Sequence, residues 1–217
     1  MGTIKKIFLY LYPIEEYTKT SLRFCGVIDY LEQKRLLSIL DECIQKRYRD
    51  KGYEVVFALY PDKELFGLTK KEQDRVILTD IDFLTVNTYA NNNDEKKDYA
   101  IKYPSELHIV EQLGGVSELV VGGYHATDCV RKVAETASKL GIKTLVDLDL
   151  TEYFFNLYKE ENYFRIDEYS PARYYNRAKD RAKYNCIPDD MNEEMLKRLF
   201  SSDVYGIYNK HKDNIRN

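Results

Sequence analysis

Short apolar runs alternate with longer amphipathic segments through the first 150 residues of the chain. Four runs, at residues 7–12, 55–60, 119–122 and 144–147, are continuous rather than alternating, which is typical of strands buried on both faces of a parallel sheet. A weaker fifth strand is predicted at residues 77–86. The pattern therefore indicates a sheet whose strands are separated by crossover connections.

The segments between these runs have helical periodicity. Residues 29–51 place leucines on one face and end at Gly52, residues 104–113 begin with Pro-Ser-Glu and end at two glycines, and residues 129–140 carry valines and alanines on one face. Strands that alternate with helices of this length predict a three-layer, Rossmann-like α/β domain, with a mostly parallel sheet and helices on both faces. We place this domain at residues 1–155.

The character of the chain changes in residues 156–217, where tyrosines and charges interleave. We interpret this part as a Tyr-rich, partly helical extension that packs on the domain or on a partner subunit, so that a homo-oligomer is expected. Its stretch at residues 170–185 has five basic residues and one acidic residue, a pattern that could bind nucleic acid. A solvated basic helix face is the preferred interpretation of that stretch.

Composition narrows the class of protein. At 44% hydrophobic and 32% charged residues over 217 positions, the chain can bury a core and remain soluble. No run approaches the roughly 18 apolar residues of a membrane span, so we expect no membrane partner. The four cysteines are far apart and form no CxxC pair, which predicts neither a zinc site nor a disulfide framework and fits a reducing cytoplasm. No metal or cofactor is expected.

The most informative stretch is VVGGYHATDC at residues 120–129, where a predicted strand runs into a predicted helix. Ligands of open α/β sheets bind at the carboxyl ends of the strands, near the point where strand order reverses. We therefore predict a ligand site here. Gly122 and Gly123 would let backbone approach the ligand or take a positive φ, Tyr124 would lie beside it, and Thr127 or Asp128 would cap the helix.

Cys129 would then lie in the first helical turn, where unpaired N–H groups and the helix dipole stabilise a thiolate. This predicts a lowered pKa and a nucleophile, and the alternative is a cysteine that packs beneath the sheet. His125 could act as a general acid or base, or could be an ordinary loop histidine.

Carboxylates follow other predicted strands. Asp147 and Asp149 lie on one side of their strand if it continues, so they could face a ligand, although capping of a following helix is the preferred interpretation. Asp62 could reach the same crevice or be a turn residue. The Gly-rich turn could also hold a phosphate or another anion, although it matches neither GxGxxG nor a P-loop.

Residues 118–149, ELVVGGYHATDCVRKVAETASKLGIKTLVDLD, resemble the C-terminal half of the isochorismatase-like cysteine hydrolases, which include the nicotinamidases. The shared order is a strand, a glycine, a Thr-Asp turn, Cys-Val, an Ala-rich helix, a glycine and another strand. One residue usually separates Thr-Asp from Cys-Val in that family, whereas the two pairs are adjacent here. The resemblance implies acyl transfer, in which Cys129 attacks an amide carbonyl and backbone N–H groups receive the oxyanion.

The resemblance also implies an acidic base after the first strand and a lysine before the nucleophile strand. This chain offers Glu15 or Glu16 for the first and Lys102 for the second, so a clear Asp-Lys-Cys triad is not present. Our leading hypothesis is a cysteine-dependent hydrolase of a small amide-like substrate. The main alternative is a non-catalytic α/β protein that binds a small anionic or nucleotide ligand or serves in assembly, and the third is nucleic-acid binding through the basic tail.

Overall fold

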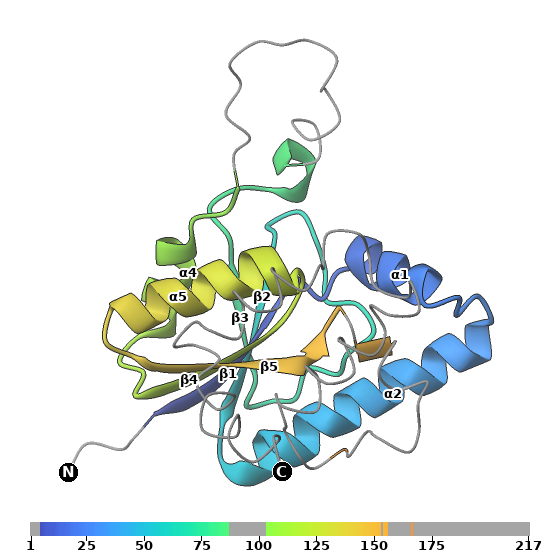
Figure 1. Ribbon diagram of the computed structural model, residues 1–217, viewed down its shortest axis with the longest axis horizontal. Coiled ribbons are helices and arrows are strands. Elements are labelled where there is room, and N and C mark those ends of the chain that lie inside the picture. The colour runs from blue at the N-terminus through green and yellow to red at the C-terminus, as the bar shows by residue number, and fades with distance from the viewer. Residues whose placement is uncertain (1–4, 87–102, 153, 156–165, 167–217) are drawn as a thin grey trace, which may run out of the picture.

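A five-stranded sheet with all neighbouring strands parallel forms the centre of the protein (Figure 1). The computed structural model describes residues 5–86, 103–152, 154, 155 and 166. The strand order is β3-β2-β1-β4-β5. The strands are β1 (Lys6–Leu11), β2 (Glu54–Leu59), β3 (Arg75–Leu78), β4 (Glu118–Gly123) and β5 (Lys143–Thr151).

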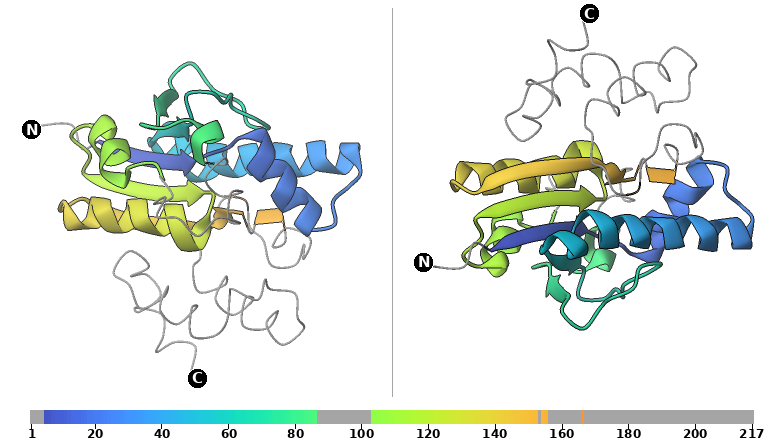
Figure 2. Two further views of the ribbon diagram at one scale, coloured as in Figure 1. Left: turned by 90° about the horizontal axis from the view of Figure 1, so that it is seen from above. Right: turned by 90° about the horizontal axis from the view of Figure 1, so that it is seen from below.

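Helices cover both faces of this sheet (Figure 2). Alternate residues of β1 point to opposite sides, so that Ile7 and Leu9 join one buried cluster and Phe8 and Tyr10 join the other. The first cluster is closed by α4 (Glu106–Leu113) and α5 (Arg131–Lys139), and the second by α1 (Glu15–Phe24) and α2 (Tyr30–Arg47). The predicted three-layer α/β fold is confirmed.

Two of the predicted helices begin with a side-chain cap. The Asp29 carboxylate accepts a hydrogen bond from the Glu32 backbone N–H at the start of α2, and the Ser105 hydroxyl accepts one from the His108 N–H at the start of α4. After α2 the chain makes a 3₁₀ turn, Arg49–Lys51, and Gly52 then takes a φ of 77°, which ends the helical segment.

The predicted fifth strand is correct in part. Strand β3 covers Arg75–Leu78, whereas a helical turn begins at Phe83 instead of a continuing strand. The Asp62 carboxylate explains this change, because it accepts hydrogen bonds from the backbone N–H groups of Phe83 at 2.7 Å and Leu84 at 3.2 Å. Asp62 therefore caps a helical turn.

Asp147 and Asp149 lie on the same side of β5, as predicted, but they cap no helix because β5 continues to Thr151. Both instead bind one guanidinium: Arg47 Nη1 lies 3.1 Å from Asp147 Oδ2 and 3.2 Å from Asp149 Oδ2, and the Tyr48 hydroxyl donates to Asp147 at 2.5 Å. The Arg47 side chain is 1% exposed and that of Asp147 is 0% exposed. This buried ion cluster ties α2 to β5.

The predicted C-terminal extension lies outside the described residues, with the exception of Ile166, whose carbonyl accepts a hydrogen bond from Arg47 Nε at 2.9 Å. Within residues 5–86 and 103–152, no helix is long and apolar enough to cross a bilayer. The same described residues contain no group of three or more metal-ligating side chains.

Candidate functional site

The strand order reverses between β1 and β4, and this is the point where α/β sheets bind their ligands. The two strands end side by side at Leu11 and Gly123, which are paired in register. The chain leaves β4 through Tyr124 and His125, across a cis peptide bond, and enters a short π-helical turn, Ala126–Val130. Cys129 lies in this turn.

Gly122 and Gly123 lie where β4 packs closely against the backbones of its neighbouring strands. Gly123 has a φ of 101°, and a Cβ atom there would lie 2.2 Å from the carbonyl oxygen of Leu11. A Cβ atom on Gly122 would lie 2.8 Å from the carbonyl oxygen of Leu150. The glycines thus allow the backbones of β1 and β5 to come close to β4, and the predicted positive φ is present at Gly123.

The turn that holds Cys129 differs from the predicted helix start. Helix α5 begins at Arg131, so that Cys129 precedes the helix and does not lie in its first turn. Asp128 does not cap α5: its Oδ1 lies 2.6 Å from the ammonium nitrogen of Lys132. The side chain of Thr127 lies outside the described residues.

The thiol of Cys129 is protonated at neutral pH. The partly buried side chain packs against the core cluster between the sheet and α4 and α5, and the resulting desolvation, followed by the charge of Asp128, raises the pKa of the thiol to about 12. A hydrogen bond from the backbone of His125 and the charge of Lys132 lower that pKa but do not reverse the shift. The predicted depression of the Cys129 pKa is therefore wrong, because burial outweighs the local dipoles.

A carboxylate and a lysine nevertheless lie next to the sulfur. The Cys129 thiol contacts Asp128 Oδ2 at 4.0 Å, and the other oxygen of that carboxylate binds Lys132. These three side chains come from one stretch of five residues, 128–132, and they differ from the acid and the lysine that the resemblance implies. Glu15 is exposed and bound to Lys19, and Lys102 lies outside the described residues. Glu16, the other acidic candidate, binds Lys63.

Three tyrosines that the sequence did not single out belong to or pack against the same core cluster as Cys129. Tyr12 follows β1 and Tyr60 follows β2, and their rings stack with centroids 4.8 Å apart, while Tyr17 of α1 packs edge-on against both. Burial and the nearby Cys129 both contribute to raising the pKa of Tyr12. The repeated Tyr-Pro after each of the first two strands is the sequence signal for this cluster.

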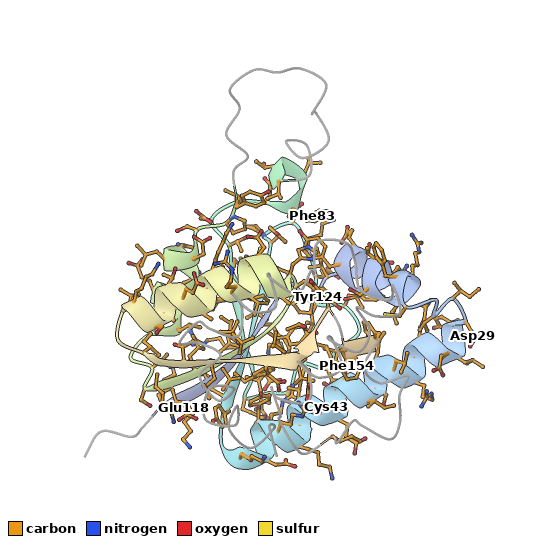
Figure 3. All side chains as sticks on the ribbon, in the orientation of Figure 1. Asp29, Cys43, Phe83, Glu118, Tyr124 and Phe154 are labelled. Atoms are coloured by element: carbon orange, nitrogen blue, oxygen red, sulfur yellow. The ribbon has the colours of Figure 1, made fainter. Side chains whose placement is uncertain are left out.

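His125 and Tyr124 point to different surroundings. The Tyr124 hydroxyl donates to Thr18 of α1 at 3.3 Å, so that this ring is buried beside α1, near the start of α5 (Figure 3). The His125 side chain is 45% exposed, and its Nδ1 lies 2.8 Å from Glu152 Oε2 just after β5. The centroid of its ring is 4.7 Å from that of Tyr17. The structure thus brings His125, Asp128 and Cys129 to one edge of the sheet.

Comparison with known proteins gives structural neighbours but no sequence relative. No family model matches the chain. No curated protein matches it either. A candidate MAR1 ribonuclease from Leishmania major is 12% identical, with 93% of each chain covered and a TM-score of 0.42. An isochorismatase-like hydrolase from Alkaliphilus metalliredigens is also 12% identical, with 74% of this chain and 90% of that chain covered and a TM-score of 0.40.

A third similar structure is a candidate isochorismatase hydrolase from Oleispira antarctica, which is 14% identical, with 70% of this chain and 77% of that chain covered and a TM-score of 0.37. The family that residues 118–149 resemble is thus among the structures to which the chain is similar. At these identities and TM-scores the likeness transfers no activity or residue role. The three-layer α/β fold is established by the parallel sheet of the chain itself.

Proposed function

We propose that the protein is a cysteine-dependent hydrolase of a small amide-like substrate, with Cys129 as nucleophile and Asp128 as its base. The observation that supports this proposal is the 4.0 Å contact between the Cys129 thiol and Asp128 Oδ2, at the edge of the sheet where strand order reverses. Lys132 balances the charge of that carboxylate from the other side. Asp128 of the turn and Lys132 of α5 thus take the places that the resemblance implies for Glu15 and Lys102.

The raised pKa of the thiol decides the order of events. Because Cys129 is protonated at rest, its proton passes to the Asp128 carboxylate as the sulfur attacks the substrate carbonyl. The carbon–sulfur bond forms, the carbon–nitrogen bond breaks, and the proton goes from Asp128 to the departing amine. A thioester on Cys129 remains, and water then hydrolyses it to the acid and the free thiol.

Ammonia release from a panel of small primary amides tests this proposal on the full chain. Cys129→Ala should abolish release, and Asp128→Asn should lower kcat about 10²- to 10⁴-fold, which is the usual contribution of a general base. Cys25→Ala is the matched control, because Cys25 is a buried cysteine outside any disulfide, in the cluster on the opposite face of the sheet. Release that survives Cys129→Ala, or a panel that the wild-type chain leaves intact, would contradict the proposal.

The same structure supports a second candidate, a non-catalytic protein that binds a small anionic or nucleotide ligand. A thiol with a pKa of about 12 is a weak nucleophile, and the half-exposed His125 lies at the same edge of the sheet, where α/β sheets bind their ligands. In that case a ligand would raise the Tm of the wild-type chain and of Cys129→Ala equally, and no amide would be cleaved.

A further inference from the structure

His125 and Glu152 form a carboxylate–imidazole pair at the edge of the sheet that holds Cys129. His125 follows β4 and Glu152 follows β5, and these strands are neighbours, so the fold fixes the pair from two sides. The distance from Nδ1 to Oε2 is 2.8 Å, and the Glu152 side chain is 16% exposed. A carboxylate accepts hydrogen bonds, so the proton lies on Nδ1 and the lone pair on Nε2 of neutral His125.

We propose, on the basis of the hydrolase function above, that His125 activates the water that hydrolyses the thioester and that Glu152 is its positioning residue. The pair would complete the reaction that Cys129 and Asp128 begin. Carboxylates that orient a histidine in this manner hold the tautomer and stabilise the imidazolium that forms when the base takes a proton.

The backbone links His125 closely to the nucleophile. The His125 carbonyl accepts hydrogen bonds from the N–H groups of Asp128 at 3.2 Å and of Val130 at 3.0 Å, which closes the turn around Cys129. The His125 backbone also hydrogen-bonds to the thiol. His125 is therefore held in the same turn as the sulfur, while its half-exposed ring can reach solvent water.

The ring of His125 faces groups from each neighbouring element. Glu152 supplies the carboxylate, Tyr17 of α1 packs its ring against the imidazole, the Tyr124 ring has its centroid 6.4 Å away, and the thiol of Cys129 lies in the same turn. Burial raises the pKa of Tyr17 and of Tyr124, so both phenols are neutral near pH 7. Among these four groups, the Glu152 carboxylate is therefore the charged one.

Water is the second reactant in the hydrolysis of the thioester. The water gives a proton to Nε2 of His125 while its oxygen adds to the thioester carbon. The carbon–sulfur bond then breaks, and the sulfur of Cys129 takes the proton from the imidazolium. The acid leaves and the thiol is restored, while Glu152 keeps its charge throughout.

Proton NMR titration tests the pairing without any substrate. The chain has three histidines, at positions 108, 125 and 211, so that His125→Gln identifies the resonance of His125 by its loss. Removing the opposite charge with Glu152→Gln should lower the pKa of His125 by about one unit or more. Glu135→Gln is the matched control, since Glu135 pairs with Arg131 on the surface of α5 and its loss should leave that pKa unchanged. A His125 pKa that is the same in Glu152→Gln and in wild type overturns the inference.

Intact mass spectrometry during turnover tests the proton transfer itself. His125→Gln should accumulate the acyl-thioester on Cys129, because acylation proceeds and hydrolysis slows by about 10²-fold or more. Glu152→Gln should slow hydrolysis about tenfold and shift its pH profile with the changed pKa of His125, which a merely structural role would not do. Normal turnover by His125→Gln, with acylation intact, overturns this inference alone. If the wild-type chain forms no acyl-enzyme on Cys129, the proposed function and this inference both fail.

Discussion

Gly123→Ala should destabilise the protein far more than the same substitution at another glycine that has a positive φ. Gly123 has a φ of 101°, and its added Cβ would lie 2.2 Å from the oxygen and 2.5 Å from the nitrogen of Leu11, both backbone atoms. Gly141 provides the matched control, because its φ is 83° and a Cβ there meets nothing within 4 Å. The two substitutions share the strain of a left-handed backbone and differ in the clash.

The magnitude follows from that comparison. A left-handed backbone costs a non-glycine residue about 1–2 kcal/mol, and this is the expected loss for Gly141→Ala. In Gly123→Ala, β1 and β4 must also separate by about 1 Å, which strains the 3.0 Å hydrogen bond from the Tyr124 N–H to the Leu11 carbonyl. With the overpacking of the strand end, we expect a further loss of about 2–4 kcal/mol.

Urea unfolding followed by far-ultraviolet circular dichroism measures both variants against wild type. The expected result is a free energy of unfolding for Gly123→Ala that lies at least about 2 kcal/mol below that of Gly141→Ala. Equal losses in the two variants would refute the reasoning, because they would mean that β1 and β4 are not in close contact at this edge.

Two further predictions concern buried and exposed side chains. Arg47→Met should lower the free energy of unfolding by about 3–5 kcal/mol, because it leaves two buried carboxylates without their cation. Arg35→Met is the control: it removes an exposed ion pair and should cost less than about 1 kcal/mol in the same urea assay. Similar losses in the two variants would contradict a buried ion cluster. Leu36→Ala should lower the free energy of unfolding by about 2–5 kcal/mol, because this residue is 0% exposed. Leu31 is 73% exposed on the same helix, so Leu31→Ser should change the free energy of unfolding by less than about 0.5 kcal/mol. A large loss for Leu31→Ser would mean that its surroundings are not as described.

The sequence was sufficient for the elements whose buried faces are apolar. Continuous apolar runs identified β1, β2, β4 and β5, and leucine spacing identified α2. Helix α1 was not predicted because its buried face consists of Thr18, Ser21 and Leu22, which give no apolar stripe. A helix whose buried face includes small polar side chains offers no row of leucines or valines to recognise.

The sequence predicts that Cys129 and His125 follow a strand end, but it does not predict the surroundings of the thiol. Position after β4 was enough to select Cys129 and His125, since the carboxyl ends of parallel strands are where ligands bind. The depth of the thiol could not be predicted, because the tyrosines and the helix that bury it come from distant parts of the chain. The ion pair of Asp147 could not be predicted for the same reason, because its partner Arg47 is 100 residues earlier and no local pattern links the two.

The tyrosines at the strand ends make the opening of this edge visible to ultraviolet absorbance. Burial raises the pKa of Tyr12, Tyr60 and Tyr124 above the ordinary value near 10. Phenols that ionise more readily in the unfolded chain favour unfolding as the pH rises above about 10, and they contribute no such effect below it. The phenolate absorbance of these three rings therefore appears at higher pH than that of an exposed tyrosine, and it reports the loss of the packing that buries them.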